Sequence, residues 1–116
     1  MWVGTLELDL LLGGTGLPVR SLKEKRSVVR PIVAELQRRF SVAAAEADHL
    51  DLHRRSVVGV AVVAADRAHC VTVLERCEKA VAERPEVELL SARLRVLHGD
   101  DDYDDEPPRN DEYAAE

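Results

Sequence analysis

Alternating apolar and polar residues mark the first and last stretches of the chain as strands with one buried face. Within residues 2–10, leucines stand at positions 6, 8 and 10, and polar side chains stand at positions 5, 7 and 9. The same alternation returns over residues 87–97. A period of two is typical of a strand between core and water. We expect the inward side chains to be Leu6, Leu8 and Leu10 in the first strand and Leu90, Ala92, Leu94 and Val96 in the last.

Two stretches with a period near 3.6 residues predict amphipathic helices. The first covers residues 21–39 and begins with Ser21 and Glu24, which have the spacing of a capping box. The second covers residues 66–83 and lies between an aspartate, a good N-cap, and a proline. Pro31 stands inside the first helix, where its ring removes a backbone donor, so we expect a kink or a restart there.

Two more strands complete the pattern and define the fold. Residues 42–48 are alanine-rich and predict an edge strand, whereas residues 56–65 are apolar and β-branched and predict a strand buried on both faces. The resulting β-α-β-β-α-β order, with right-handed crossovers, predicts an α+β ferredoxin-like sandwich. Its antiparallel four-stranded sheet has the order 4-1-3-2, and two helices cover one face.

The charge of the chain is unevenly distributed. Residues 99–116 hold nine acidic residues and one arginine, a charge of −8, which leaves +2 on residues 1–98. The length suits one domain, so we expect a ferredoxin-like domain over residues 1–98 and an acidic, disordered tail over residues 99–116. The folded part is therefore compatible with an anionic partner.

Several classes of protein are excluded by composition. The longest apolar run, Val57–Ala65, has nine residues, whereas a membrane helix needs about 20. The first residues lack a basic leader and a cleavage site, and two cysteines make no disulfide framework. We expect a cytoplasmic protein with no membrane partner, and no motif indicates a cofactor.

The strongest candidate for function is a basic stretch in the first helix. Lys23, Arg26 and Arg30 lie within an arc of about 60° on the helical wheel. A row of guanidinium groups can bind phosphates through charge-assisted hydrogen bonds, although a solvated helix flank gives the same pattern. The candidate nucleic-acid-binding residues are Lys23, Lys25, Arg26 and Arg30 in the helix, with Arg54 and Arg55 as a rim in the connector.

Two other clusters carry weaker signals. Asp48, His49, Asp51 and His53 have metal-ligand residue types, but a polar turn with aspartates capping its backbone explains them equally, and we assign no metal. Two cysteines, seven residues apart on the second helix, are too far apart for a disulfide and fit its core stripe.

The chain resembles the YlxP-like family of small bacterial proteins of unknown function. The resemblance is carried by residues 3–6, 38–42, 45–52 and 85–90, and above all by the run Ser21-Leu22-Lys23-Glu24-Lys25-Arg26. It implies a ferredoxin-like fold and a helix that continues through Pro31. Genes of this family often lie beside those for translation initiation and ribosome assembly factors, which suggests a role near RNA.

These observations lead to two hypotheses of different classes. The first is a non-enzymatic module, associated with RNA or the ribosome, that binds phosphates through the basic helix flank. The alternative is a domain that binds a protein or small ligand and oligomerises through the open sheet face, where residues 57–65 leave two or three small apolar side chains. An enzyme is not expected, because no motif combines a nucleophile, a base and oxyanion donors.

Overall fold

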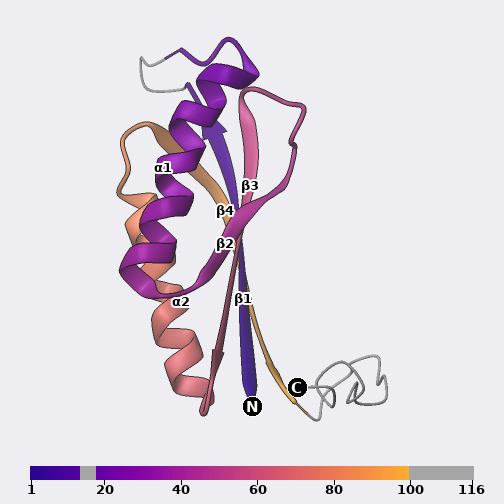
Figure 1. Cartoon of the computed structure of the whole chain (residues 1–116), viewed down its shortest axis with the longest axis vertical. Helices are drawn as coiled ribbons and strands as arrows, with labels where there is room; N and C mark the ends of the chain where they lie inside the picture. Colours follow the sequence, from indigo (N-terminus) through magenta and orange to yellow (C-terminus); the bar gives the residue numbers. More distant parts are fainter. Residues whose placement is uncertain (14–17, 100–116) are drawn as a thin grey trace, which may run out of the picture.

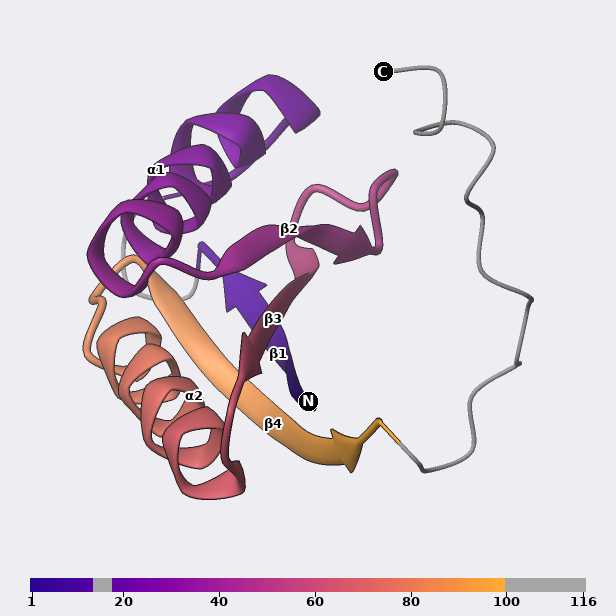
Figure 2. The same cartoon turned by 60° about the horizontal axis from the view of Figure 1, so that its bottom comes forward.

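The computed structural model describes residues 1–13 and 18–99, so the predicted acidic tail from residue 100 onward lies outside the described residues. The predicted sandwich is confirmed: the sheet is antiparallel, in the order β2-β3-β1-β4, and both helices cover one of its faces (Figures 1 and 2). The elements are β1 (Trp2–Leu12), α1 (Leu22–Phe40), β2 (Ala43–Asp48), β3 (Arg55–Ala64), α2 (Arg67–Ala82) and β4 (Val87–His98).

Side-chain caps start both helices where the sequence predicts them. The Ser21 hydroxyl accepts a hydrogen bond from the Glu24 amide at 3.1 Å, and Asp66 caps α2 by accepting from the His69 amide at 2.8 Å. α1 is one unbroken helix, so the expected restart at Pro31 is wrong. Pro31 is exposed, and water can therefore satisfy the carbonyl that loses its helical partner.

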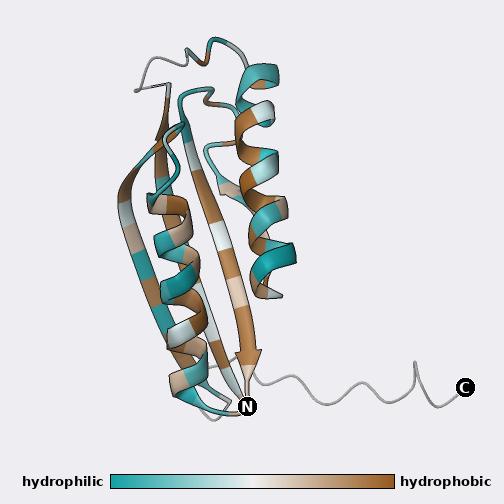
Figure 3. Cartoon of the chain, turned by 90° about the vertical axis from the view of Figure 1, so that its left-hand side faces the viewer, coloured by the Kyte–Doolittle hydropathy of each residue, from teal (hydrophilic) through white to brown (hydrophobic). Residues whose placement is uncertain are grey.

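The core lies between the helices and the sheet, where the apolar stripes of both helices face the strands (Figure 3). The two cysteines are free and fully buried, as expected for core residues. Burial raises the pKa of the Cys77 thiol to about 11, which keeps it protonated at neutral pH. The fully buried leucines and isoleucine of this core are Leu6, Leu8, Leu10, Leu12, Ile32, Leu36 and Leu74.

Two predictions about the strands are wrong in detail. β3 is buried on its helix-facing side only, and Val63 on the other side is 64% exposed, because no described element covers that face. In β4 the register shifts opposite Asp9 and Leu10, so that Leu89 rather than Leu90 packs against the core. This bulge leaves Leu90 exposed.

Gly4 in β1 allows α2 to approach the sheet closely. A Cβ atom at this position would lie 2.7 Å from Leu74 Cδ1 and 3.2 Å from Cys70 Cβ, both in α2. Because both neighbours are fully buried, neither has free space to move into. The packing of α2 on β1 therefore depends on the missing side chain.

We predict that Gly4→Val destabilises the fold by about 1–3 kcal/mol, the usual cost of overpacking a core. For a domain of this size, each 1 kcal/mol lowers Tm by about 4–8 °C. Thr5→Val, at the next residue and on the open face of the sheet, is the control and should leave Tm nearly unchanged. Equal melting temperatures for the two variants in thermal unfolding would contradict the close approach.

Candidate nucleic-acid interface

Three cations of α1 point into solvent on one side of the helix. Lys23, Arg26 and Arg30 are exposed, and none of them forms an ion pair or a side-chain hydrogen bond with any residue in the described ranges. We call these three residues the α1 basic flank. Because their charges are not used inside the fold, they are available to an anionic ligand.

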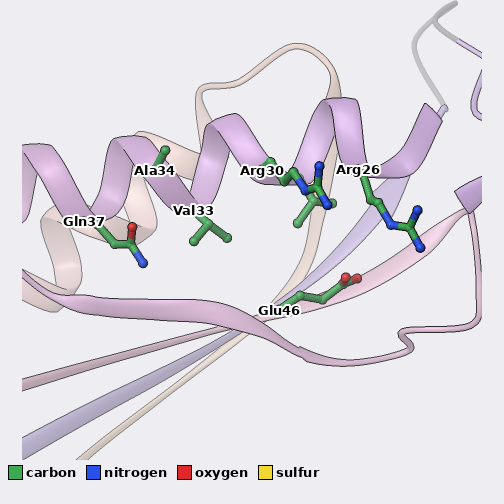
Figure 4. A pocket seen from close by; sticks show the side chains of 7 residues that line it. Arg26, Arg30, Val33, Ala34, Gln37 and Glu46 are labelled. Atoms are coloured by element: carbon green, nitrogen blue, oxygen red, sulfur yellow. The ribbon is translucent and has the colours of Figure 1, made fainter. Parts of the chain in front are cut away.

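Arg26 and Arg30 of the α1 basic flank line a groove between α1 and β2 (Figure 4). This α1–β2 groove has a volume of about 330 Å³. Figure 4 shows the side chains of Arg26 and Arg30 at one end of it, with Val33 and Gln37 pointing from α1 toward the strand. Its lining residues are Arg26, Val29, Arg30, Val33, Ala34, Gln37 and Glu46.

Lys25 does not belong to the binding surface, contrary to the prediction from the sequence. Its side chain is 2% exposed, and its ammonium lies 2.6 Å from Glu46 Oε2 and donates to the His49 carbonyl at 2.6 Å. Lys25 and the next residue, Arg26, differ in exposure because successive residues of a helix point about 100° apart. Arg26 therefore faces solvent while Lys25 faces the sheet.

Glu46 holds the inner wall of the groove in place. Its Oε2 accepts a second hydrogen bond, at 2.7 Å, from the fully buried hydroxyl of Ser56 in β3. Lys25, Glu46 and Ser56 thus connect α1, β2 and β3 through one carboxylate oxygen. The other end of the groove is fixed by Gln37, whose amide donates to the Ala44 carbonyl at 2.9 Å.

The structure does not bring the two connector arginines to the α1 basic flank. Arg55 belongs to β3, and its Nη2 lies 2.8 Å from each carboxylate oxygen of Asp9, so its charge is already paired. This corrects its assignment to a phosphate-binding rim. Arg54 is exposed but lines a separate hollow with Arg20 and His53, at the end of the domain near residues 13 and 18.

The segment with aspartates and histidines forms a tight turn after β2. His49 has a φ of 57°, its amide donates to Asp48 Oδ1 at 2.7 Å, and its carbonyl accepts from the Leu52 amide at 3.1 Å. These contacts fit the interpretation as a polar turn. Across residues 1–13 and 18–99, no group of three His, Cys, Asp or Glu side chains is placed to hold a metal ion.

Sequence reasoning missed both Glu46 and Gln37 as groove residues. The alternation of β2 contains a usable signal for Glu46, since Ala44 and Glu46 pair with Val60 and Val58, whose side chains face the helices. A carboxylate on the buried face of a strand needs a cation, and this requirement points to a lysine on the facing helix. Gln37 has no comparable signal in the sequence.

The fold and this groove define a small α+β domain with unpaired cations between its first helix and its edge strand. A family model described as a protein of unknown function, DUF503, matches residues 3–94. The chain therefore belongs to the DUF503 family. It is also 30% identical, over 86 residues, to the uncharacterized protein YlxP of Bacillus subtilis strain 168, covering 74% of this chain and 89% of that protein.

These comparisons confirm the predicted resemblance to the YlxP-like family. Among the helices that the structure describes, none has the length and apolar character needed to cross a bilayer.

We predict that Lys25→Ala destabilises the protein by about 3 kcal/mol, because it leaves the Glu46 carboxylate without its cation. This value is at the low end for buried pairs, since the Glu46 side chain keeps 19% exposure. Lys23→Ala, two residues away on the exposed flank, should change stability by less than about 0.5 kcal/mol. Urea unfolding measures both variants, and similar midpoints would show that the Lys25–Glu46 pair is not structural.

Proposed function

We propose that this protein is a non-enzymatic module that binds the phosphate backbone of RNA, in the cytoplasm and in association with the ribosome. The observation that carries the proposal is the division of cations along α1. Lys25 is used inside the fold, whereas Arg26 and Arg30 stand unpaired, within the described residues, side by side at the groove (Figure 4). Guanidinium groups in such a row fit phosphates bidentately.

The spacing of the α1 basic flank supports a strand-like ligand. Lys23 and Arg30 are seven residues apart, so their positions are separated by about 10 Å along the helix axis at 1.5 Å per residue. Arg26 lies between them on the same side. Several cations in a line match the repeated charges of a phosphate backbone better than they match one small anion.

The residues that the structure describes support catalysis less well than they support phosphate binding. The buried cluster of Lys25, Glu46 and Ser56 contains a hydroxyl next to a carboxylate, but Ser56 has no exposed surface for a substrate to reach. The neighbourhood of genes for translation factors, implied by the YlxP-like family, favours RNA as the anion.

The test is a salt titration of RNA binding with the double variant Arg26→Ala, Arg30→Ala. Each phosphate contact contributes about one unit to the slope of log K against log salt, so the variant should lose about two units and bind about tenfold more weakly at low salt. The matched control is Arg67→Ala with Arg76→Ala, which removes two exposed cations of α2, away from α1 and from the open face of the sheet. Unchanged slope in the α1 variant, or equal losses in both, would refute the assignment.

The open face of the sheet favours a second function, self-association of two copies of the chain. Val3 pairs with Val63 on one side and with Leu97 on the other, so the three form an apolar patch at one end of the face, where Val63 is 64% and Leu97 39% exposed. On the same face, β1 carries Glu7 where β4 carries Arg93.

These charges make the face self-complementary. A twofold axis between β1 and β4 brings Glu7 of each copy over Arg93 of the other and covers both apolar patches. Within one copy Glu7 and Arg93 form only a weak, exposed ion pair at 4.0 Å, so both charges remain open to a partner, whereas the Asp9 carboxylate is already held by Arg55.

We predict that Val63→Glu shifts a dimer toward the monomer at micromolar concentration, since it places a charge in the apolar patch. Leu50→Glu is the control, because Leu50 is 63% exposed in the turn after β2 and lies outside the sheet. Sedimentation equilibrium measures the mass of each variant. A wild-type protein that stays monomeric at these concentrations would exclude this second function.

A further inference from the structure

The α1–β2 groove combines an apolar wall with polar groups at its rim. Val33 and Ala34 supply most of its apolar surface, with the buried Val29 at its floor, and the two arginines of the flank stand beside it. A volume of about 330 Å³ is at the small end for ligand pockets, too small for a folded partner and suited to a flat ring. An unstacked base can lie against apolar side chains while neighbouring cations hold its phosphate.

Glu46 adds a directed acceptor to this groove. Its Oε2 is occupied by Lys25 and Ser56, whereas no partner for Oε1 occurs among the residues that the structure describes. The Lys25 ammonium also balances the charge of the carboxylate, so Glu46 does not repel a nearby phosphate as a lone anion does. Figure 4 shows the carboxylate directed from β2 toward the side of α1 that carries Arg26 and Arg30.

We propose that the groove takes one base of the bound strand, and that this base carries an exocyclic amine that donates to Glu46 Oε1. The proposal rests on the phosphate-binding function above and adds base selectivity to it. The base lies against Val33 and Ala34, while its phosphate lies on Arg26 and Arg30.

A comparison of the affinities for cytosine and uracil distinguishes this proposal from simple phosphate binding. The two bases have the same ring and the same backbone charge, but cytosine presents an amine at C4 where uracil presents a carbonyl oxygen. The amine donates to a carboxylate oxygen, whereas the carbonyl places two acceptors against each other. Because a hydrogen bond to a charged group is involved, cytosine should bind about tenfold more tightly than uracil.

The experiment titrates labelled oligocytidine and oligouridine of equal length against the full chain at each of several salt concentrations. A second arm uses the mononucleotides CMP and UMP, which separates a base within a strand from a free nucleotide. The groove variant is Ala34→Gln, which places a longer side chain at the exposed lip of the groove without disturbing the helix. The matched control is Ala68→Gln, the same change at an exposed position of α2.

A preference of about tenfold for cytidine in the wild type and in Ala68→Gln, and its loss in Ala34→Gln, supports the base subsite. A preference for CMP over UMP without any preference between the two oligomers overturns the subsite for a base of the strand and assigns the groove to a free nucleotide. Equal affinities for cytidine and uridine, with a normal salt slope, overturn the subsite and leave phosphate binding intact. Failure of both oligomers to bind overturns the subsite together with the proposed function.

Discussion

A buried ammonium group has to be neutralised, and the way this chain neutralises Lys25 determines how α1 sits over β2. The ammonium bonds to a carboxylate in β2 and to a carbonyl in the following turn, so helix, edge strand and connector meet at one point. Such a pair adds little net stability over apolar packing, but losing one partner is costly. The width of the groove, and the positions of Arg26 and Arg30 along it, follow from this contact.

The architecture could be predicted because its signals are local. Alternation in β1, and caps at Ser21 and Asp66, depend on residues within a few positions of one another, and each is present in the structure. The strand order then follows from handedness and from the apolar composition of β3. The one-residue bulge at Leu90 has a signal that the prediction did not use. The apolar positions change from odd, at Val87 and Leu89, to even, from Leu90 onward, where two leucines are adjacent.

The site was only partly predictable from the sequence. The charge of Lys25 indicates a surface residue, whereas its position along α1 indicates a buried one. Lys25, Val29, Ile32 and Leu36 follow the spacing i, i+4, i+7, i+11, and all four are buried. The core stripe of α2, at Cys70, Leu74, Cys77 and Val81, has the same spacing. A prediction from charge alone therefore places Lys25 at the surface, whereas its spacing in the buried stripe of α1 places it in the core. The groove lies between α1 and β2, and its width depends on how these two elements pack. No local pattern in the sequence predicts that packing distance.

The edge position of β2 has a consequence for how chains behave when crowded. An exposed strand edge offers unpaired backbone groups to another molecule and is a starting point for aggregation. β2 is short, its register with β3 shifts between Glu46 and Asp48, and Glu46 points inward as a charge. All three features discourage strand addition. The carboxylate that shapes the groove therefore also disfavours the addition of another strand at β2, while it leaves the groove beside that strand accessible.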